Sequence, residues 1–251
     1  MRLLRDMSGH YLMHHISVIY YGYMRAASTV SALHRDAPET QNLPMAEQAY
    51  DLLEDKIVYL ELVPGQIYSE ADLSEAIGLG RTPMREALIR LAKEKLVEMI
   101  PRRGVRISQI DLGKHIALLE TRKALDVLIA TRAARRVNQQ QKDTLREYAA
   151  GMLAAADSGE IDTYIEIDNA LDLLLASACK NEFAVEAVAH LYAHCKRFWA
   201  FYHEHANMKL FAQQHSELML AVAEADEEKA KIAVTAIVDH QIDFTRLALD
   251  L

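Results

Sequence analysis

The segment from Leu62 to Ile107 constrains the fold of this chain more than any other part of it. Two short helical patterns stand there on either side of a tight turn. Ser69 is a natural N-cap for a helix over residues 70–77, and Gly78 suits the left-handed position that ends such a helix. A second helix begins near Arg81. This order allows one helix to brace a second one that enters a DNA groove.

The second helix is followed by a short basic hairpin. Pro83 lies in the first helical turn, where its missing N–H costs little. Residues 97–100 and 105–107 are predicted to be strands, and residues 101–104 form the turn between them. A helix-turn-helix followed by such a hairpin is a winged helix-turn-helix, so we expect an N-terminal domain of that class.

The residues with which this domain would contact DNA are mainly arginines. Arg81 and Arg85 are four residues apart on one helix face, and a guanidinium matches O6 and N7 of guanine, worth about 1–3 kcal/mol of discrimination. The helix N-terminus offers N–H groups to phosphate. A single surface arginine is more often only a solvated charge, but the combined order of helices and hairpin favours DNA contact. The predicted contacts are Arg81, Thr82, Pro83, Arg85, Arg102, Arg103 and Gly104, the glycine because it lets the backbone come close.

The charge of the chain is unevenly distributed. The net charge is −8, which disfavours DNA for the chain as a whole. Between residues 76 and 108, however, eight lysines and arginines stand against three acidic residues, an excess of five. The attraction between basic side chains and DNA phosphate acts within about 8–10 Å, so the local excess of positive charge matters more for DNA binding than the net charge of the chain. The acidic remainder would repel DNA and confine contact to one end.

The rest of the chain, from residue 111 onward, shows helical periodicity throughout. The breaks are short, which predicts neighbouring helices that run antiparallel in a bundle. The predicted helices cover residues 111–137, 139–157, 160–179, 182–204, 208–225 and 227–249. The expected fold class is mainly α, with an N-terminal winged helix-turn-helix and a C-terminal, all-helical antiparallel bundle of about six helices.

On this interpretation the chain consists of three segments. Residues 1–42 are an N-terminal extension that we expect to be poorly ordered, or else the result of a start codon assigned too early. Residues 43–109 form the DNA-binding domain, and residues 110–251 form an effector-binding and dimerisation domain. The apolar run over residues 11–24 is too short and too polar to span a membrane, and no clear signal-peptide cleavage site follows it. We expect a cytoplasmic protein with two reduced cysteines.

The predicted bundle contains polar residues that it would have to bury. Two carboxylates four residues apart share one helix face, and two histidines lie on later helices. This donor set suits a divalent cation such as Zn²⁺, Mn²⁺ or Ni²⁺. The spacing alone is weak evidence, because such residues are more often solvated, and His190 and His194 fit by spacing equally well. The candidate ligands are Asp168, Asp172, His215 and His240.

Residues 62–107 resemble the winged helix-turn-helix of the GntR family of bacterial transcription regulators. The resemblance implies that Arg81, Thr82, Arg85, Arg103 and Gly104 contact DNA. The departures from the family pattern are Gly80 for the usual Ser or Thr, Ala71 where some members have a contacting arginine, and Lys95 for glycine. The matching residues are Pro64, Gly65, Glu70, Leu73, Gly78, Arg81, Thr82, Pro83, Arg85, Glu86, Ala87, Leu88, Leu91, Glu94, Leu96, Val97, Pro101, Arg103 and Gly104.

Residues 113–251 resemble the effector domain of the FadR/FCD subfamily of these regulators. Many members bind a metal through an aspartate, a histidine four residues later and two further histidines. This pattern maps to Asp168, Asp172, His215 and His240, and Asp172 stands where the family has histidine. The metal site is therefore either retained with a harder oxygen ligand or lost. The matching runs lie at residues 118–125, at residues 168–172 followed by residue 181, and around residues 215 and 240.

The resemblance implies that the effector is a small organic acid, whose carboxylate meets the metal and a nearby cation. Arg122 is the first candidate for that cation and Arg197 the second, although both can instead form structural ion pairs. The expected function is a homodimeric transcriptional regulator, by default a repressor, whose operator affinity the effector controls. The alternatives are a metal-dependent enzyme at the same four residues, for which no general base is evident, and a nucleoid binder indifferent to sequence.

Overall fold

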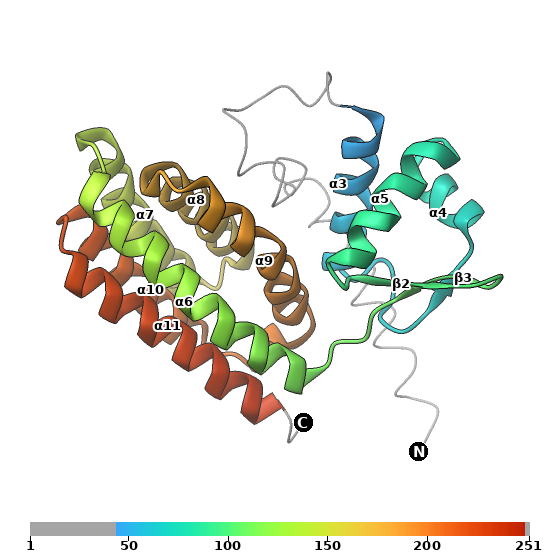
Figure 1. Cartoon of the computed structure of the whole chain (residues 1–251). Helices are drawn as coiled ribbons and strands as arrows, with labels where there is room; N and C mark the ends of the chain where they lie inside the picture. Colours follow the sequence, from blue (N-terminus) through green and yellow to red (C-terminus); the bar gives the residue numbers. More distant parts are fainter. Residues whose placement is uncertain (1–43, 249–251) are drawn as a thin grey trace, which may run out of the picture.

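The computed structural model describes residues 44–248, so the extension predicted for residues 1–42 lies outside the described residues. The expected fold class is confirmed: a small head, formed by α3 to β3, precedes a helical bundle, formed by α6 to α11 (Figure 1). The elements are α3 (Met45–Val58), β1 (Ile67–Tyr68), α4 (Glu70–Ile77), α5 (Arg81–Lys93), β2 (Val97–Ile100), β3 (Gly104–Ile107), α6 (Leu112–Arg136), α7 (Gln139–Ser158), α8 (Ile161–Cys179), α9 (Glu182–Tyr202), the 3₁₀ helix η3 (His203–His205), α10 (Met208–Ala223) and α11 (Glu227–Leu247).

The helix-turn-helix of the head begins and ends where its local residues require. The Ser69 hydroxyl accepts from the Asp72 backbone N–H and the Asp72 carboxylate accepts from the Ser69 N–H, each at 3.1 Å, which is a capping box. Gly78 ends α4 with a φ of +67°. Gly80 is the N-cap of α5, and no side chain caps that end. The first turn of α5 therefore has N–H groups that phosphate can use.

The hairpin of the head is a small antiparallel sheet with one strand more than the sequence predicted. The strand order is β1-β3-β2. β2 pairs with β3 from Val97 opposite Ile107 to Ile100 opposite Gly104, which confirms the predicted hairpin. β1 pairs with β3 through Ile67 opposite Arg106. A strand of two residues has no periodicity to detect, so only its pairing reveals it.

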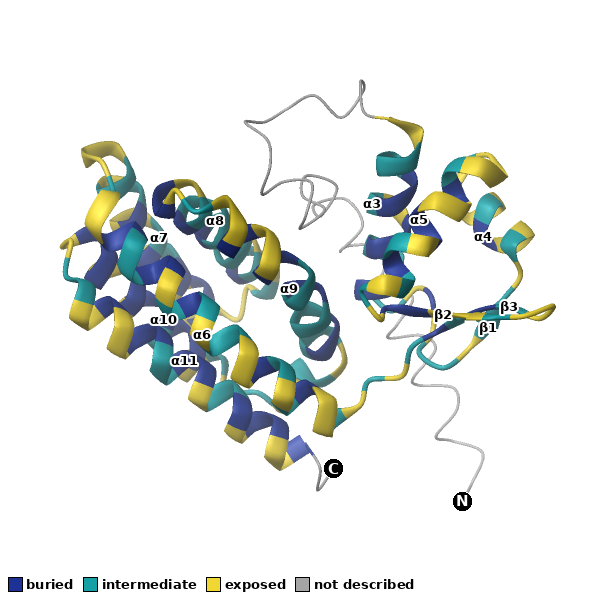
Figure 2. Cartoon of the chain, in the orientation of Figure 1, coloured by how far each residue is buried: buried dark blue, intermediate teal, exposed yellow. Residues whose placement is uncertain are grey.

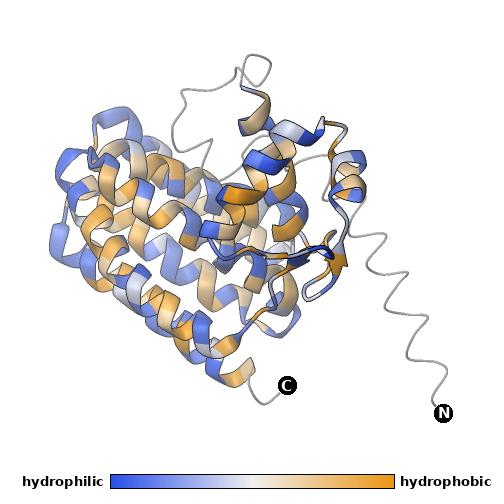
Figure 3. Ribbon diagram, turned by 45° about the vertical axis from the view of Figure 1, so that its right-hand side comes forward, coloured by the Kyte–Doolittle hydropathy of each residue, from blue (hydrophilic) through white to orange (hydrophobic). Residues whose placement is uncertain are grey.

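The bundle is built around a core of alanines and larger aliphatic side chains, with a smaller number of aromatic rings. Figure 2 shows the buried residues on the inner sides of its helices, and Figure 3 shows hydrophobic and hydrophilic residues alternating around them. α6 packs mainly on α11 and α8, whereas α7 packs on α10 and α8. Helices that are neighbours in the chain are therefore not always packing partners, and the short connections alone could not predict this. No helix in residues 44–248 is long and apolar enough to cross a membrane.

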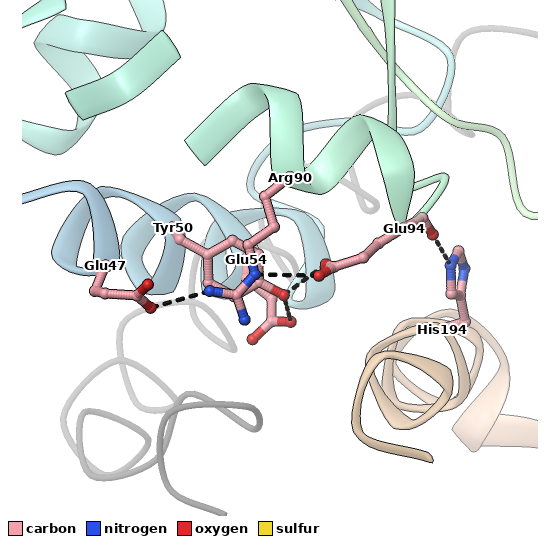
Figure 4. A network of polar contacts seen from close by, with 6 residues as sticks. All are labelled: Glu47, Tyr50, Glu54, Arg90, Glu94 and His194. Atoms are coloured by element: carbon pink, nitrogen blue, oxygen red, sulfur yellow. Dashed lines mark hydrogen bonds and ion pairs between the residues drawn. The ribbon is translucent and has the colours of Figure 1, made fainter. Parts of the chain in front are cut away.

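The head and the bundle meet along α3 and α9. Ala193 of α9 is buried within the hydrophobic core of the head. A ring nitrogen of His194 lies 2.8 Å from the backbone carbonyl oxygen of Glu94, directly after the last residue of α5 (Figure 4). The Arg197 guanidinium, which is buried, donates to the carbonyl oxygen of Ser108, just beyond β3. One helix of the bundle thus holds both the end of α5 and the end of the hairpin.

A polar network in the head requires an additional proton. The Tyr50 hydroxyl lies 2.7 Å from a carboxyl oxygen of Glu54 and 2.6 Å from one of Glu94 (Figure 4). It carries a single hydrogen, so one of the two contacts needs a protonated carboxyl. Glu54 is 1% exposed, and burial raises its pKa from 4.5 to about 7. We therefore assign the proton to Glu54.

Replacing Glu54 with glutamine is expected to make the stability of the chain less sensitive to a rise in pH from 5 to 8. The pKa of Glu54 in the folded chain lies above its unfolded value, so its contribution is fully present below about pH 4.5 and is lost as the pH rises through 7. The wild type should lose up to about 3 kcal/mol more unfolding free energy between pH 5 and pH 8 than E54Q. Urea unfolding at both pH values measures this, with E75Q at an exposed glutamate of α4 as control. Parallel behaviour of wild type and E54Q would contradict the assignment.

Candidate functional site: an exposed helix end and a cavity in the bundle

The predicted DNA contacts gather at the N-terminal end of α5. Arg81, Thr82 and Arg85 are exposed, and Pro83 is partly covered. The Arg85 guanidinium lies 3.0 Å from a carboxylate oxygen of Glu70, at the start of α4. Met84 and the other apolar residues of α5 are buried against the head, so the arginines occupy the opposite side. The structure therefore brings these four residues together on one surface.

The wing presents its two arginines at the tip of the hairpin. Arg102 and Arg103 are exposed, and Arg102 has a φ of +62°. Gly104 has a φ of +111°, and a Cβ atom there would lie 2.2 Å from the carbonyl oxygen of Tyr68. The sequence pattern attributed this glycine to close approach of DNA. The structure gives it another role, because Gly104 lets β3 pass close to β1.

The bundle encloses a cavity of about 120 Å³. A water molecule needs roughly 10–15 Å³, so the cavity is large enough for a small ligand. Its walls are mainly aliphatic and aromatic, and the polar residues come from all the bundle helices except α7. Tyr59, which follows α3 in the head, also lines it. The aromatic rings of the wall include Tyr164, Phe198, Trp199, Phe211 and Phe244.

Arg122 lines this cavity, as the resemblance led us to expect. Its guanidinium lies 2.8 Å from the Asp126 carboxylate and donates to the amide oxygen of Gln241 at 3.1 Å. The Tyr192 hydroxyl donates to the other oxygen of Asp126 at 2.9 Å. Arg122 is therefore held in a buried ion pair, the alternative that the sequence left open. Arg197 is not among the residues that line the cavity, because it turns toward Ser108.

The four predicted metal ligands are only partly assembled. His215 Nε2 lies 3.3 Å from Asp168 Oδ1. Burial, followed by the charge of Asp168, raises the pKa of Asp172 to about 7. His240 Nδ1 faces the amide oxygen of Gln214 at 2.8 Å, and its ring stacks on Phe211. Within residues 44–248 no group of three or more His, Cys, Asp or Glu side chains is arranged to hold a metal ion. The donors present therefore do not fit the metal site that the resemblance implied.

Most cavity residues escaped the sequence prediction, and His115 and Tyr59 are two examples. His115, at the start of α6, stacks on Phe198 with ring centroids 4.1 Å apart. Burial lowers the pKa of His115 to about 3, so the ring is neutral at physiological pH. Tyr59 belongs to the head, and no local pattern links it to the bundle. Only packing between distant segments places these rings in the cavity.

Comparisons with known proteins give both halves of the chain a context. Residues 45–107 match the model of bacterial regulatory proteins, gntR family, and residues 117–240 match the FCD domain. The HTH-type transcriptional repressor RspR of Escherichia coli K12 is 25% identical over 193 residues, covering 76% of this chain and 85% of that protein. The regulator LutR of Bacillus subtilis 168 is 25% identical over 199 residues, covering 70% and 90%.

The fold is also shared with solved structures. The structure of E. coli McbR/YncC aligns with a TM-score of 0.72 at 18% identity, over 82% of this chain and 99% of that chain. A transcriptional regulator GntR from Rhodococcus aligns with a TM-score of 0.64 at 17% identity, over 81% and 98%. At these identities the likeness concerns the fold alone.

Proposed function

Because this chain belongs to the GntR family of bacterial regulatory proteins and carries an FCD domain, we propose that it is a repressor that a small effector releases from its operator. It is a DNA-binding transcriptional regulator with an effector-binding domain, and the relatives described above are regulators rather than enzymes. The proposal assigns DNA binding to residues 43–109 and effector binding and dimerisation to residues 110–251. It places the protein in the bacterial cytoplasm.

The exposed surface at the start of α5 supports operator binding. Arg81 and Arg85 can reach base edges in the major groove, while Thr82 and the first N–H groups of α5 contact phosphate. Arg102 and Arg103 of the wing would hold the flanking backbone. A homodimer would set two such helices about 34 Å apart, in successive major grooves of a near-palindromic operator.

The main support for effector control is that α9 both lines the cavity and contacts the head. Tyr192, Phe198 and Trp199 line the cavity, whereas His194 and Arg197 contact the head. Tyr59 of the head reaches the cavity itself. A ligand in the cavity would therefore touch both partners of the junction between head and bundle, and would change operator affinity if it prefers one arrangement of that junction.

The effector predicted from the sequence has two components. An organic acid and a Zn²⁺, Mn²⁺ or Ni²⁺ ion were both expected. The arrangement of Asp168, Asp172, His215 and His240 does not favour the ion, and the Arg122 guanidinium is already paired with the Asp126 carboxylate. We therefore assign the cavity to a small effector that binds without a metal ion.

Replacing His194 with alanine is expected to weaken the coupling between cavity and operator. A ligand that raises the melting temperature of the wild type should weaken binding to upstream promoter DNA by roughly tenfold, within the usual range of allosteric coupling. In H194A the same ligand should still bind, but its effect on DNA should shrink, because the link to the end of α5 is gone. Thermal shift and fluorescence anisotropy of labelled DNA measure the two quantities.

The control is H190A, one turn earlier on α9. This variant should respond to the ligand like the wild type. Equal coupling in H194A and wild type would contradict the proposed route through α9. A screen in which no small molecule alters operator affinity would contradict effector control altogether.

A further inference from the structure

One buried side-chain atom of the cavity wall lacks a partner among residues 44–248, and it is an acceptor. Asp168, Asn169 and Asp172 line it from α8. The Asn169 Oδ1 atom is buried without a hydrogen-bond partner among the described residues. Asp172 lies within the electrostatic reach of Asp168, Lys196 and Arg122. A ligand that satisfies this wall must supply hydrogen-bond donors.

His215 of α10 lies beside Asp168 on the same wall. Its Nδ1 atom lies 2.7 Å from the carbonyl oxygen of Phe211, which can only accept, so Nδ1 carries a hydrogen. The Nε2 atom faces Asp168 Oδ1 at 3.3 Å, so the imidazole ring lies beside one oxygen of that carboxylate.

The cations of the protein around the cavity are already engaged. Arg122 is paired with Asp126 and Gln241. Lys196 acts electrostatically on Asp172 and also on Glu54 and Asp55 of the head. The residues that line the cavity include three acids (Asp126, Asp168, Asp172) and two bases (Arg122, Lys196), a formal excess of one negative charge. A carboxylate ligand would increase this excess.

The remaining wall suits an organic cation. The ring centroid of Trp199 lies 6.4 Å from that of Tyr164, 5.2 Å from that of Phe211 and 6.3 Å from that of Phe244. Aromatic faces attract a cation through their quadrupole, most strongly when water is excluded. The same rings would cover the apolar body of a ligand.

We propose that the cavity binds a small primary amine with a flat apolar body, whose ammonium donates to Asp168, Asp172 and Asn169. An ammonium has three N–H donors and no acceptor, which matches the three side-chain oxygen acceptors that α8 presents on this wall. The inference rests on the proposed function, since it names the class of effector for the same cavity. It replaces the organic acid that the family resemblance implied.

The experiment uses the full chain after treatment with a chelator. Trp199 is the only tryptophan of the chain, so its fluorescence reports on the cavity directly. The probes are phenethylamine and 3-phenylpropionate, which share a phenyl ring and a two-carbon linker and differ in ammonium or carboxylate. Zn²⁺, Mn²⁺ and Ni²⁺ are titrated separately. We expect saturable quenching or enhancement and a higher melting temperature with phenethylamine alone.

Two variants test the contacts. D172N keeps the shape of the side chain and removes its charge, and should weaken phenethylamine binding by roughly 10- to 100-fold, the worth of a charged hydrogen bond. D168N is a second variant with the same expectation, used if D172N does not fold. E166Q, an exposed carboxylate on the same helix, is the control and should bind like the wild type.

The outcomes separate this inference from the proposed function. The inference is overturned if 3-phenylpropionate binds more tightly than phenethylamine, or if the chain binds a stoichiometric metal ion. It is also overturned if phenethylamine gives no signal up to roughly 10 mM, which is a weak affinity for a small ligand. Unchanged amine affinity in D172N and D168N would overturn it as well. If 3-phenylpropionate binds to the chain and also releases it from upstream DNA, the inference fails while effector control stands. If the chain without ligand does not prefer upstream DNA, the proposed function fails whichever probe binds.

Discussion

Replacing Arg85 with alanine is expected to lower the preference for operator over unrelated DNA by about 1–3 kcal/mol, the worth of one bidentate contact with guanine. Arg85 is exposed on the first turns of α5, where a groove-binding helix reads bases. Its ion pair with Glu70 at 3.0 Å holds the side chain before DNA arrives. The pair is largely exposed, so its loss should change folding stability little.

The measurement is fluorescence anisotropy with upstream promoter DNA and with a scrambled duplex, at several salt concentrations. K93A is the matched control, because Lys93 is exposed at the opposite end of α5. K93A should leave the preference unchanged. If R85A loses the same affinity for both duplexes, Arg85 contacts only phosphate. If R85A loses no affinity for either duplex, Arg85 is not part of the DNA interface.

Replacing Gly104 with alanine is expected to damage the wing itself. The new Cβ atom would lie 2.2 Å from the carbonyl oxygen of Tyr68, which is backbone and cannot turn away. The φ of +111° also costs a residue with a side chain about 1–3 kcal/mol. Together these effects should separate β1 from β3 and lower the unfolding free energy by at least that amount, with weaker DNA binding as a consequence.

Urea unfolding and operator titration of G104A test this prediction. G113A is the control, since Gly113 lies in the first turn of α6 and an added Cβ would meet only Asp111 Oδ1 at 3.5 Å. G113A should be as stable as the wild type or slightly more stable, because alanine favours helices. A fully stable G104A would show that the glycine serves DNA approach, as the sequence pattern suggested, and not the sheet.

The parts of the fold that depend on neighbouring residues could be predicted from the sequence. Ser69, Asp72 and Gly78 fix the ends of α4 through contacts within a few residues. The helices of the bundle end at local breaks as well, and α6 extends over Leu112–Arg136 where residues 111–137 were predicted. Which helices pack together depends on the whole core, so the pairing of α6 with α11 was not accessible.

The candidate site divides in the same way. The exposed arginines of α5 follow from helical spacing, and Asp126, four residues after Arg122, could have been identified by spacing as its partner. The position of Tyr59 in the cavity and the contact of Arg197 with Ser108 join segments far apart in the chain. The family pattern suggested a metal, but the surroundings of Asp172 and His240 decide whether the donors converge, and these surroundings are set by packing.

The most direct test of the account is the affinity of the full chain for its own upstream promoter DNA compared with a scrambled duplex, at about 0.15 M salt. We expect the chain to bind its upstream promoter DNA at least roughly a thousandfold more tightly than the scrambled duplex, as is usual for specific over nonspecific binding. A chain that binds both duplexes equally, with the same steep salt dependence, would be a nucleoid binder indifferent to sequence. That result would contradict the reading of bases by α5, on which the proposed repression depends.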